Sequence, residues 1–244
     1  MQKTVLNNPI VAHRGAWLEF NLPENSIASL MKAIEIGVGA TEFDVHMTAD
    51  NVLVVYHDYD YNGLKIEQTT YKELQNFTLE NGEKLPRVID FLEIGLKQKN
   101  TKLIFEIKSS ETSLQRTQQI VDEVEKLFNH TDYSDRLEFI LFSWEACQYL
   151  KSKLPNYNVS FLNGDKTPNQ VKMANLNGID YNIKTYKKLE NYISESKSLG
   201  LSLNTWTVNT IEDLEFFLYY NFDMITTNKP QLFLEEYKNR KSNS

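Results

Sequence analysis

The sequence contains little cysteine and glycine and no long apolar segment. One cysteine, Cys147, stands among 244 residues, which excludes an internal disulfide and a thiolate zinc cluster. Glycine occurs nine times, and no glycine-rich turn of the dinucleotide-binding type is present. The longest purely apolar runs, such as residues 52–55 and 103–105, are far shorter than the ~20 residues of a membrane-spanning helix. We therefore expect no membrane span and no disulfide framework.

Positive charge is also scarce. Lys and Arg number 26 against 33 Asp and Glu, and the net charge of −7 argues against a nucleic-acid partner, whose phosphates need a basic surface. The first nine residues contain one lysine and no hydrophobic core, so a signal peptide is not predicted. We expect a cytoplasmic protein, or a mature exported one whose signal has been removed. No residue pattern indicates an oligomeric state.

The remaining composition is that of an ordinary globular domain. Hydrophobic residues make up 41% of the chain and charged residues 24%, which excludes intrinsic disorder and coiled coil. The length suits one large domain, and no linker or repeat divides the chain, so we predict a single domain over residues 1–244.

Short β-rich runs alternate with helix-patterned segments along the whole chain. The predicted strands are Ile10–His13, Ala40–Val45, Lys102–Ile107, Glu138–Phe142, Asn158–Leu162, Gly178–Tyr181, Leu201–Val208 and Phe222–Thr226. The predicted helices are Ser26–Ile36, Val88–Lys97, Leu114–Asn129, Trp144–Lys153, Pro168–Asn175, Tyr186–Ser198, Ile211–Tyr220 and Pro230–Asn239. Alternating strands and helices in this number predict a (β/α)₈ TIM barrel. A doubly wound sheet is the alternative.

One stretch interrupts this alternation. About forty residues, 47–87, separate the second predicted strand from the second predicted helix, which is much longer than an ordinary connection. Its start is typical of a hairpin, in which residues 49–51 turn the chain and residues 52–56 return. Long loops after barrel strands project from the catalytic face, so we expect this insertion to shape the site.

Charged side chains gather at the ends of the predicted strands. Strand residues alternate between two faces, so both carboxylates of Glu42 and Asp44 point to one side, as do Glu106 and Lys108. The hairpin returns His57 to the same rim. The side chains expected at this mouth are His13, Arg14, Glu42, Asp44, His57, Glu106 and Lys108.

These residue types together predict phosphodiester cleavage. Burying Glu42 or Glu106 without a partner would cost several kcal/mol, and neighbouring carboxylates repel each other. A divalent cation such as Mg²⁺ or Ca²⁺ prefers oxygen ligands and removes both penalties. The cation, with Arg14 and Lys108, would carry the charge of an anionic substrate. Histidines titrate near neutral pH and can transfer protons to and from the reacting oxygens.

The order of these motifs resembles the glycerophosphodiester phosphodiesterase family. The matching stretches are Val11-Ala12-His13-Arg14-Gly15, Pro23-Glu24-Asn25-Ser26, Glu42-Phe43-Asp44-Val45, Val54-Val55-Tyr56-His57-Asp58, Phe105-Glu106-Ile107-Lys108, Asn204-Thr205-Trp206-Thr207-Val208-Asn209 and Ile225-Thr226-Thr227-Asn228-Lys229-Pro230. They extend from about residue 10 to residue 231. The resemblance implies a barrel with a small insertion after the second strand.

The resemblance also implies a reaction and the residues that perform it. A glycerophosphodiester would be hydrolysed to sn-glycerol 3-phosphate and an alcohol, a reaction of lipid and glycerol metabolism. His13 and His57 would be the acid–base pair, and Glu42, Asp44 and Glu106 would bind a divalent metal, Mg²⁺ or Ca²⁺.

Further residues would contact the substrate. The resemblance implies that Arg14 and Lys108 hold the phosphate and that Trp206 forms an apolar wall of the pocket. Asn25 and Ser143 are additional candidates for polar contacts. The attacking group would be the glycerol 2-hydroxyl, which gives a cyclic phosphate that water then opens, or water itself.

Several features depart from the family pattern or allow more than one interpretation. Residues 59–64 replace an Arg-Thr element that commonly follows the His-Asp pair, so the contacts of the insertion to substrate are expected to differ. Asn228 stands where an aspartate is common, which we expect to alter a cap rather than the chemistry. His46 shares a face with Glu42 and Asp44 and could be a fourth ligand, but we interpret it as an exposed structural residue where the strand leaves the barrel.

Three other functions remain as alternatives. A phospholipase-like phosphodiesterase or lyase would stop at the cyclic phosphate. A glycosidase could use Glu42 and Glu106 as its carboxylate pair, but it would leave both histidines without a role. A catalytically silent barrel could bind glycerophosphodiesters as a sensor.

Overall fold

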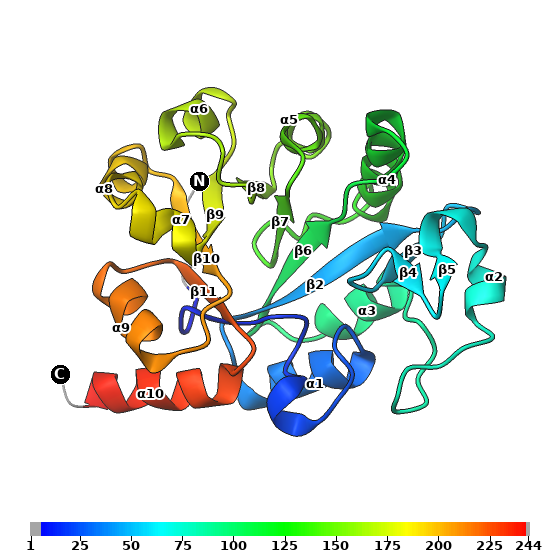
Figure 1. The fold of residues 1–244 in the computed structure, drawn as a ribbon, viewed down its shortest axis with the longest axis horizontal. Helices are drawn as coiled ribbons and strands as arrows, with labels where there is room; N and C mark the ends of the chain where they lie inside the picture. The colour runs from blue at the N-terminus through cyan, green and yellow to red at the C-terminus, as the bar shows by residue number, and fades with distance from the viewer. Residues whose placement is uncertain (1–5, 243–244) are drawn as a thin grey trace.

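The computed structural model describes residues 6–242 and contains a closed barrel (Figure 1). Residues 1–5, part of the segment searched for a signal peptide, and residues 243–244 lie outside the described range. Within it, the eight parallel strands in barrel order are β1 Ile10–Ala12, β2 Ala40–Met47, β6 Lys102–Ile107, β7 Leu137–Leu141, β8 Asn158–Phe161, β9 Gly178–Asn182, β10 Ser202–Trp206 and β11 Met224–Thr227. Strand β11 pairs with β1, with Ile225 beside Ile10, and closes the ring. The predicted TIM barrel is confirmed.

Helices connect the strands and surround the barrel (Figure 1). They are α1 Ile27–Ile36, α3 Val88–Gly95, α4 Leu114–Leu127, α5 Trp144–Lys153, α6 Pro168–Met173, α7 Ile183–Lys188, α8 Asn191–Ser198, α9 Ile211–Tyr219 and α10 Pro230–Ser242, with a short 3₁₀ helix at Leu18–Phe20. Among the described residues, none of the helices has both the length and the apolar character needed to cross a membrane.

One predicted helix is two helices in the structure. The sequence pattern predicts continuous helix over Tyr186–Ser198, whereas α7 and α8 are separated at Leu189 and Glu190. Helix α7 begins earlier than predicted because the Asn182 side chain accepts a hydrogen bond from the Lys184 N–H. It ends at Leu189, whose φ of −128° and ψ of 61° are not helical. Capping residues therefore set bounds that the hydrophobic spacing does not show.

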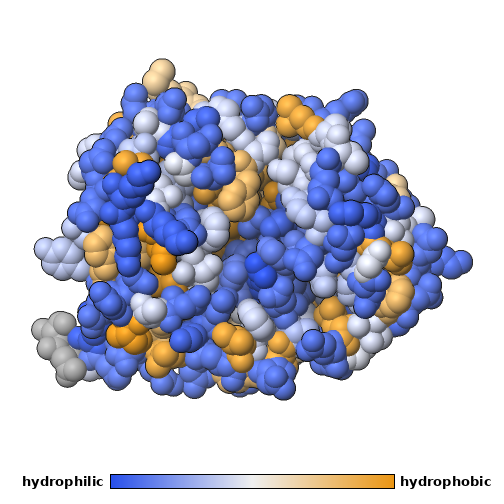
Figure 2. All heavy atoms as spheres, in the orientation of Figure 1, coloured by the Kyte–Doolittle hydropathy of each residue, from blue (hydrophilic) through white to orange (hydrophobic). Residues whose placement is uncertain are grey.

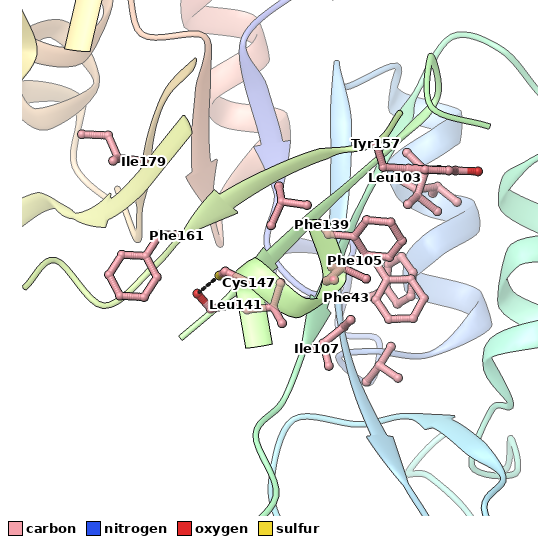
Figure 3. Packing of buried hydrophobic residues seen from close by; sticks show 14 of the residues in the cluster. Phe43, Leu103, Phe105, Ile107, Phe139, Leu141, Cys147, Tyr157, Phe161 and Ile179 are labelled. Carbon is pink, nitrogen blue, oxygen red and sulfur yellow. Dashed lines mark hydrogen bonds between the residues drawn. The ribbon is translucent and has the colours of Figure 1, made fainter. Parts of the chain in front are cut away.

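Aromatic packing outside the barrel determines which side chains face inside. Phe43, Phe105 and Phe139 lie on neighbouring strands and pack against each other under the helices, with ring centroids 4.9 and 5.3 Å apart (Figure 3). Successive strand residues point to opposite faces. The residues adjacent to Phe43 and Phe105 in sequence therefore point into the barrel, and these are Glu42, Asp44, Ile104 and Glu106.

The insertion after β2 has a small core of its own. The predicted hairpin is present, because β3 (Leu53–Val55) returns antiparallel to β2 and places Val55 beside Val45. The elements that follow are β4 Asp60–Tyr61, β5 Leu64–Lys65, a 3₁₀ turn at Ile66–Gln68 and α2 Tyr71–Leu74. Their buried apolar residues are Val54, Tyr61, Ile66, Leu74 and Leu85. The insertion therefore packs as a compact unit beside the mouth of the barrel.

Candidate active site

The turn after β1 presents Arg14 at the mouth of the barrel. Arg14 and Gly15 both have positive φ values, 57° and 82°. The Arg14 carbonyl accepts hydrogen bonds from the Asn25 N–H (3.0 Å) and the Ser29 hydroxyl (3.1 Å), which fixes the turn against the start of α1. A Cβ on residue 15 would lie 2.4 Å from Ser29 Oγ. Glycine is required here both for its conformation and for the close approach of α1.

Three buried carboxyl groups meet at the ends of β2 and β6. One oxygen from each of Glu42, Asp44 and Glu106 lies within 4.8 Å of the other two. Asp44 and Glu106 are neighbours in the parallel register of the two strands, and Glu42 points inward two residues earlier. The exposed fraction of each residue is 8% or less. The structure thus brings together the three carboxylates predicted as metal ligands.

Two cations lie among these carboxylates. Lys108 Nζ is 3.1 Å from Asp44 Oδ1 and 2.8 Å from Glu106 Oε1. Arg14 donates two hydrogen bonds to the Glu24 carboxylate, at 2.9 and 3.0 Å, and its Nε lies 3.4 Å from Asp44 Oδ2. Four carboxylates therefore share two positive charges. When all four carboxylates are ionised, the net charge of the cluster is negative, and two further positive charges would neutralise it.

The acidic groups respond to this imbalance in different ways. Burial and the neighbouring charges of Asp44 and Glu106 raise the pKa of Glu42 well above its usual range. Burial, followed by the charge of Asp44, raises the pKa of Glu106 to about 7. Burial would also raise the pKa of Asp44, but the charges of Lys108 and Arg14 outweigh it and lower that pKa. Additional positive charge at this place would therefore favour the ionised forms of Glu42 and Glu106.

The donor set fits a hard divalent cation. Glu42 Oε2 accepts the Arg14 backbone N–H at 3.0 Å, whereas Glu42 Oε1 is buried and has no hydrogen-bond partner among the described residues. A buried oxygen without a partner destabilises the folded state unless a hydrogen-bond donor or a metal ion binds it. All three groups offer oxygen, which Mg²⁺ and Ca²⁺ prefer. Glu42, Asp44 and Glu106 could therefore hold either ion.

His13 faces the carboxylates from the end of β1. Its Nδ1 lies 2.7 Å from Asn228 Oδ1, an acceptor, so Nδ1 carries the proton and Nε2 is free. That Nε2 lies 3.9 Å from Glu42 Oε2. Burial, and then the charge of Arg14, lower the pKa of His13 to about 4, so its ring is neutral at physiological pH.

The contact of Asn228 with His13 corrects one expectation. The departure from aspartate at this position was expected to alter a cap, but the Asn228 side chain contacts His13 instead. The last strand and the first are neighbours in the closed barrel, which brings Asn228 beside His13 across 215 positions of sequence. A neutral amide at this place fixes the tautomer of His13 without adding negative charge.

The insertion contributes His57 to the pocket, and His46 contacts the backbone of the same segment. His57 Nδ1 lies 2.7 Å from Asp58 Oδ1, and about a third of the His57 side chain is exposed. The interpretation of His46 as exposed is wrong, because β2 continues to Met47 and the insertion covers it, leaving His46 5% exposed. The His46 Nε2 lies 3.1 Å from the His57 carbonyl oxygen. His46 therefore holds the segment that carries His57.

A pocket of about 220 Å³ joins these groups to an apolar wall. Its lining residues are His13, Arg14, Glu42, His57, Glu106, Lys108, Ile140, Phe142, Leu162, Asp180, Trp206, Thr207 and Thr226. Figure 2 shows the middle of the face seen in Figure 1 as a hollow with hydrophobic residues at its upper edge and hydrophilic residues below. The pocket therefore has one charged side and one apolar side.

The chain matches the model of the glycerophosphoryl diester phosphodiesterase family over residues 13–232. It belongs to that family. Membership confirms the predicted resemblance and the prediction of an enzyme, a phosphodiesterase.

Individual relatives are similar over nearly their whole length. A glycerophosphodiester phosphodiesterase of known structure from Parabacteroides distasonis is 37% identical, with a TM-score of 0.92 and coverage of 97% of this chain and 99% of that one. A glycerophosphodiester phosphodiesterase from Caldanaerobacter subterraneus is 26% identical over 91% of this chain and 94% of its own. An Oleispira antarctica phosphodiesterase, solved with the product sn-glycerol-3-phosphate, shares the fold at 20% identity, with a TM-score of 0.79 and coverage of 93% and 96%.

Other predicted site residues lie behind or beside the pocket of this family member. Asn25 is buried and donates from Nδ2 to Asp44 Oδ2 at 2.8 Å, while its Oδ1 accepts the Asp44 N–H. Ser143 caps α5 by accepting the Ala146 N–H at 3.2 Å. Trp206 lines the pocket as predicted, and its Nε1 donates to the Asp180 carbonyl at 2.8 Å. Substrate contacts by Asn25 and Ser143 stay predictions.

Sequence reasoning missed two residues at this site. Glu24 was seen only as part of a motif, yet it pairs with Arg14. Asp180 was not singled out, although it lines the pocket. A signal for Asp180 was present, because it stands between the apolar residues Ile179 and Tyr181 of a predicted strand. Alternation places such a residue on the inner face of a barrel.

Proposed function

We propose that this protein is a divalent-cation-dependent hydrolase that cleaves glycerophosphodiesters to sn-glycerol 3-phosphate and an alcohol. One observation carries the proposal: at the barrel mouth, beside the imidazoles of His13 and His57, the carboxylates of Glu24, Glu42, Asp44 and Glu106 are accompanied by only two cations, Arg14 and Lys108. A phosphodiester is an anion that such a pocket binds only when the negative charge is balanced. The product named in the Oleispira antarctica complex is consistent with this substrate class.

Glu42, Asp44 and Glu106 would hold a divalent cation, Mg²⁺ or Ca²⁺, which would balance part of the negative charge and supply Lewis-acid polarisation of the phosphate. Arg14 and Lys108 then bind the phosphate oxygens. Burial alone would lower the pKa of Lys108, but the carboxylates of Asp44 and Glu106 outweigh it and raise that pKa, so the ammonium keeps its charge. Glu24 orients the Arg14 guanidinium from its outer side.

The two imidazoles are suited to different proton transfers. His13 is neutral and has its free Nε2 directed toward the carboxylate cluster, so it accepts the proton of the attacking hydroxyl. His57 is held at the pocket by the contact of its Nδ1 with the Asp58 carboxylate, and we assign it the proton transfer to the leaving alcohol. The attacking oxygen is the glycerol 2-hydroxyl, and water opens the cyclic phosphate that results. Trp206 and Phe142, whose rings meet edge to face 5.6 Å apart, keep bulk water from the glycerol arm.

A panel of glycerophosphodiesters with coupled detection of glycerol 3-phosphate tests the proposal. Activity should require Mg²⁺ or Ca²⁺, disappear with EDTA and return when either ion is restored. Hydrolysis that resists EDTA would contradict the role of the cation. Phosphorus NMR of the reaction should show glycerol 3-phosphate as the final product, and accumulation of a cyclic phosphate would identify a lyase instead.

A further inference from the structure

A buried carboxyl without a partner lies on the apolar side of the pocket. Asp180 is the middle residue of β9, points into the barrel and is 3% exposed. Its Oδ1 has no hydrogen-bond partner among the described residues. The same residue lines the pocket that contains His13 and Glu106. Nothing in the charge balance described above uses it.

Barrel geometry places Asp180 opposite the carboxylate cluster. In the ring formed within residues 6–242, β9 is four strands from β2 in either direction. The phosphate-binding groups all come from β1, β2 and β6 or the turns that follow them. Asp180 therefore faces the end of a bound substrate that lies farthest from phosphorus.

Apolar side chains line the pocket beside Asp180, and the buried Asn204 is its neighbour on β10. Ile140, Phe142 and Leu162 form this side of the pocket, and Trp206 completes it. The Trp206 indole is held by the Asp180 carbonyl, so the ring and the carboxyl keep a fixed relation. A small polyol fits this combination, because its carbon chain packs on the aromatic wall while a hydroxyl reaches the carboxyl.

The carboxyl is retained at a cost in stability. Burial, then the charges of Glu106 and Glu138, raise the pKa of Asp180 to about 8. An unpaired buried polar group destabilises a fold, and a group kept in spite of this points to a ligand. With its pKa raised to about 8, the Asp180 carboxyl is largely uncharged at neutral pH. It therefore suits a hydroxyl, which can both donate and accept a hydrogen bond, better than a cationic head group.

We propose that Asp180 binds the glycerol hydroxyl farthest from phosphorus and selects glycerol phosphodiesters over those that lack this hydroxyl. The inference rests on the proposed function and adds a specificity-determining residue to it. A site that hydrogen-bonds a substrate hydroxyl discriminates strongly against an analogue without it, because the buried group is then left unpaired.

Two substrates that differ in one hydroxyl test the inference. They are the ethyl ester of glycerol 3-phosphate and the ethyl ester of propane-1,2-diol 1-phosphate, which keeps the 2-hydroxyl. With Mg²⁺, wild-type kcat/KM should favour the glycerol ester by about tenfold or more. Asp180→Leu should bring the two values to within about twofold by lowering kcat/KM for the glycerol ester alone. Asp180→Asn, which keeps an acceptor, should give an intermediate preference.

A matched control separates this role from a structural one. Glu138→Gln changes another buried carboxyl of the barrel interior and should keep the wild-type preference. Asp180→Leu should unfold at a temperature no lower than the wild type, because it removes an unpaired buried group.

Each other outcome counts against the inference. A wild-type preference retained in Asp180→Leu, or equal loss of activity on both esters, would overturn it and leave the proposed function intact. A change in Asp180→Leu that affects only the ratio between choline and ethyl esters of glycerol phosphate would show that the residue reads the head group. Hydrolysis of neither ester by the wild type would overturn the proposed function, and the inference with it.

Discussion

The barrel interior carries charged groups at both ends, and the two ends are built differently. At the amino-terminal ends of the strands, Lys102 and Glu138 form a buried ion pair, and Asn158 donates to the same Glu138 oxygen at 2.9 Å. One positive charge there meets one negative charge. At the carboxyl-terminal ends, Glu42, Asp44 and Glu106 inside the barrel and Glu24 in the loop after β1 share two positive charges, those of Arg14 and Lys108.

The difference shows which buried charges belong to the fold and which to the chemistry. In a matched pair such as Lys102 and Glu138, each charge is balanced by its partner, so no ion or ligand from outside the protein is required. In the unmatched cluster, burial and the neighbouring charges raise the pKa of Glu42 and Glu106, and one oxygen of Glu42 has no hydrogen-bond partner among residues 6–242. We infer that the ion pair at the amino-terminal ends of the strands stabilises the barrel, while the excess of carboxylates at the carboxyl-terminal ends binds a cation and, with it, an anionic substrate.

The largest expected effect is on turnover at the unmatched end. His13→Ala and His57→Ala should each reduce kcat by roughly 10²–10⁴-fold, because each removes a proton-transfer group. Both variants should keep the far-ultraviolet circular dichroism of the wild type. Steady-state kinetics with saturating Mg²⁺ measure the effect. Near-normal turnover in either variant would remove that histidine from the mechanism.

Breaking the matched pair should instead affect stability. Glu138→Ala leaves the Lys102 ammonium buried and unpaired, and we expect a loss of about 3–5 kcal/mol in the free energy of unfolding. Turnover per folded molecule should stay close to normal. Urea denaturation measures the loss, and the double variant Lys102→Met, Glu138→Leu should recover most of it. A single variant within about 1 kcal/mol of the wild type would show that the pair does not stabilise the barrel.

Removing one unmatched carboxylate should separate activity from stability. Glu42→Gln should lower activity by roughly 100-fold or more, since even the partners of metal ligands contribute 10–100-fold. Burial raises the pKa of Glu42, so this group lowers the stability of the folded state as the pH rises above the ordinary carboxyl range, and the uncharged glutamine should not. In metal-free buffer the variant should therefore melt at or above the wild-type temperature. A clear drop in Tm would mean that Glu42 is a structural group.

The smallest expected effect is a pH dependence of cation affinity. Burial and the charge of Asp44 raise the pKa of Glu106 to about 7, so below that pH a proton competes with the cation. Glu42 also has a raised pKa and adds its own competition by protons, so the apparent affinity for Mg²⁺ should rise with pH by at least roughly tenfold per unit below pH 7. Calorimetric titrations at several pH values measure this slope. Affinity that does not change with pH would exclude Glu106 as a ligand.

Much of the fold was predictable because strand and helix patterns are local. The bounds of β6 and α5 match the predicted ranges, since each is an apolar-patterned run with clear ends. Alternation around Phe43 and Phe105 was enough to place the three carboxylates inside the barrel. This part of the site follows from neighbouring residues, which the sequence displays directly.

The rest of the site depends on closure of the ring and on the insertion. Asn228 reaches His13 only because the last strand pairs with the first. His46 is buried because β3 returns along β2 and brings the insertion over it. Neither contact has a local pattern, so reasoning from the sequence found neither of them.

A structure determined from a crystal soaked in Mn²⁺ would test the central claim most directly. Anomalous scattering from manganese, a stand-in for Mg²⁺ with the same preference for oxygen, locates the ion without ambiguity. We predict one strong peak bonded to Glu42, Asp44 and Glu106, with the imidazoles of His13 and His57 on either side of it. A peak at another place, or none at this cluster, would contradict the account.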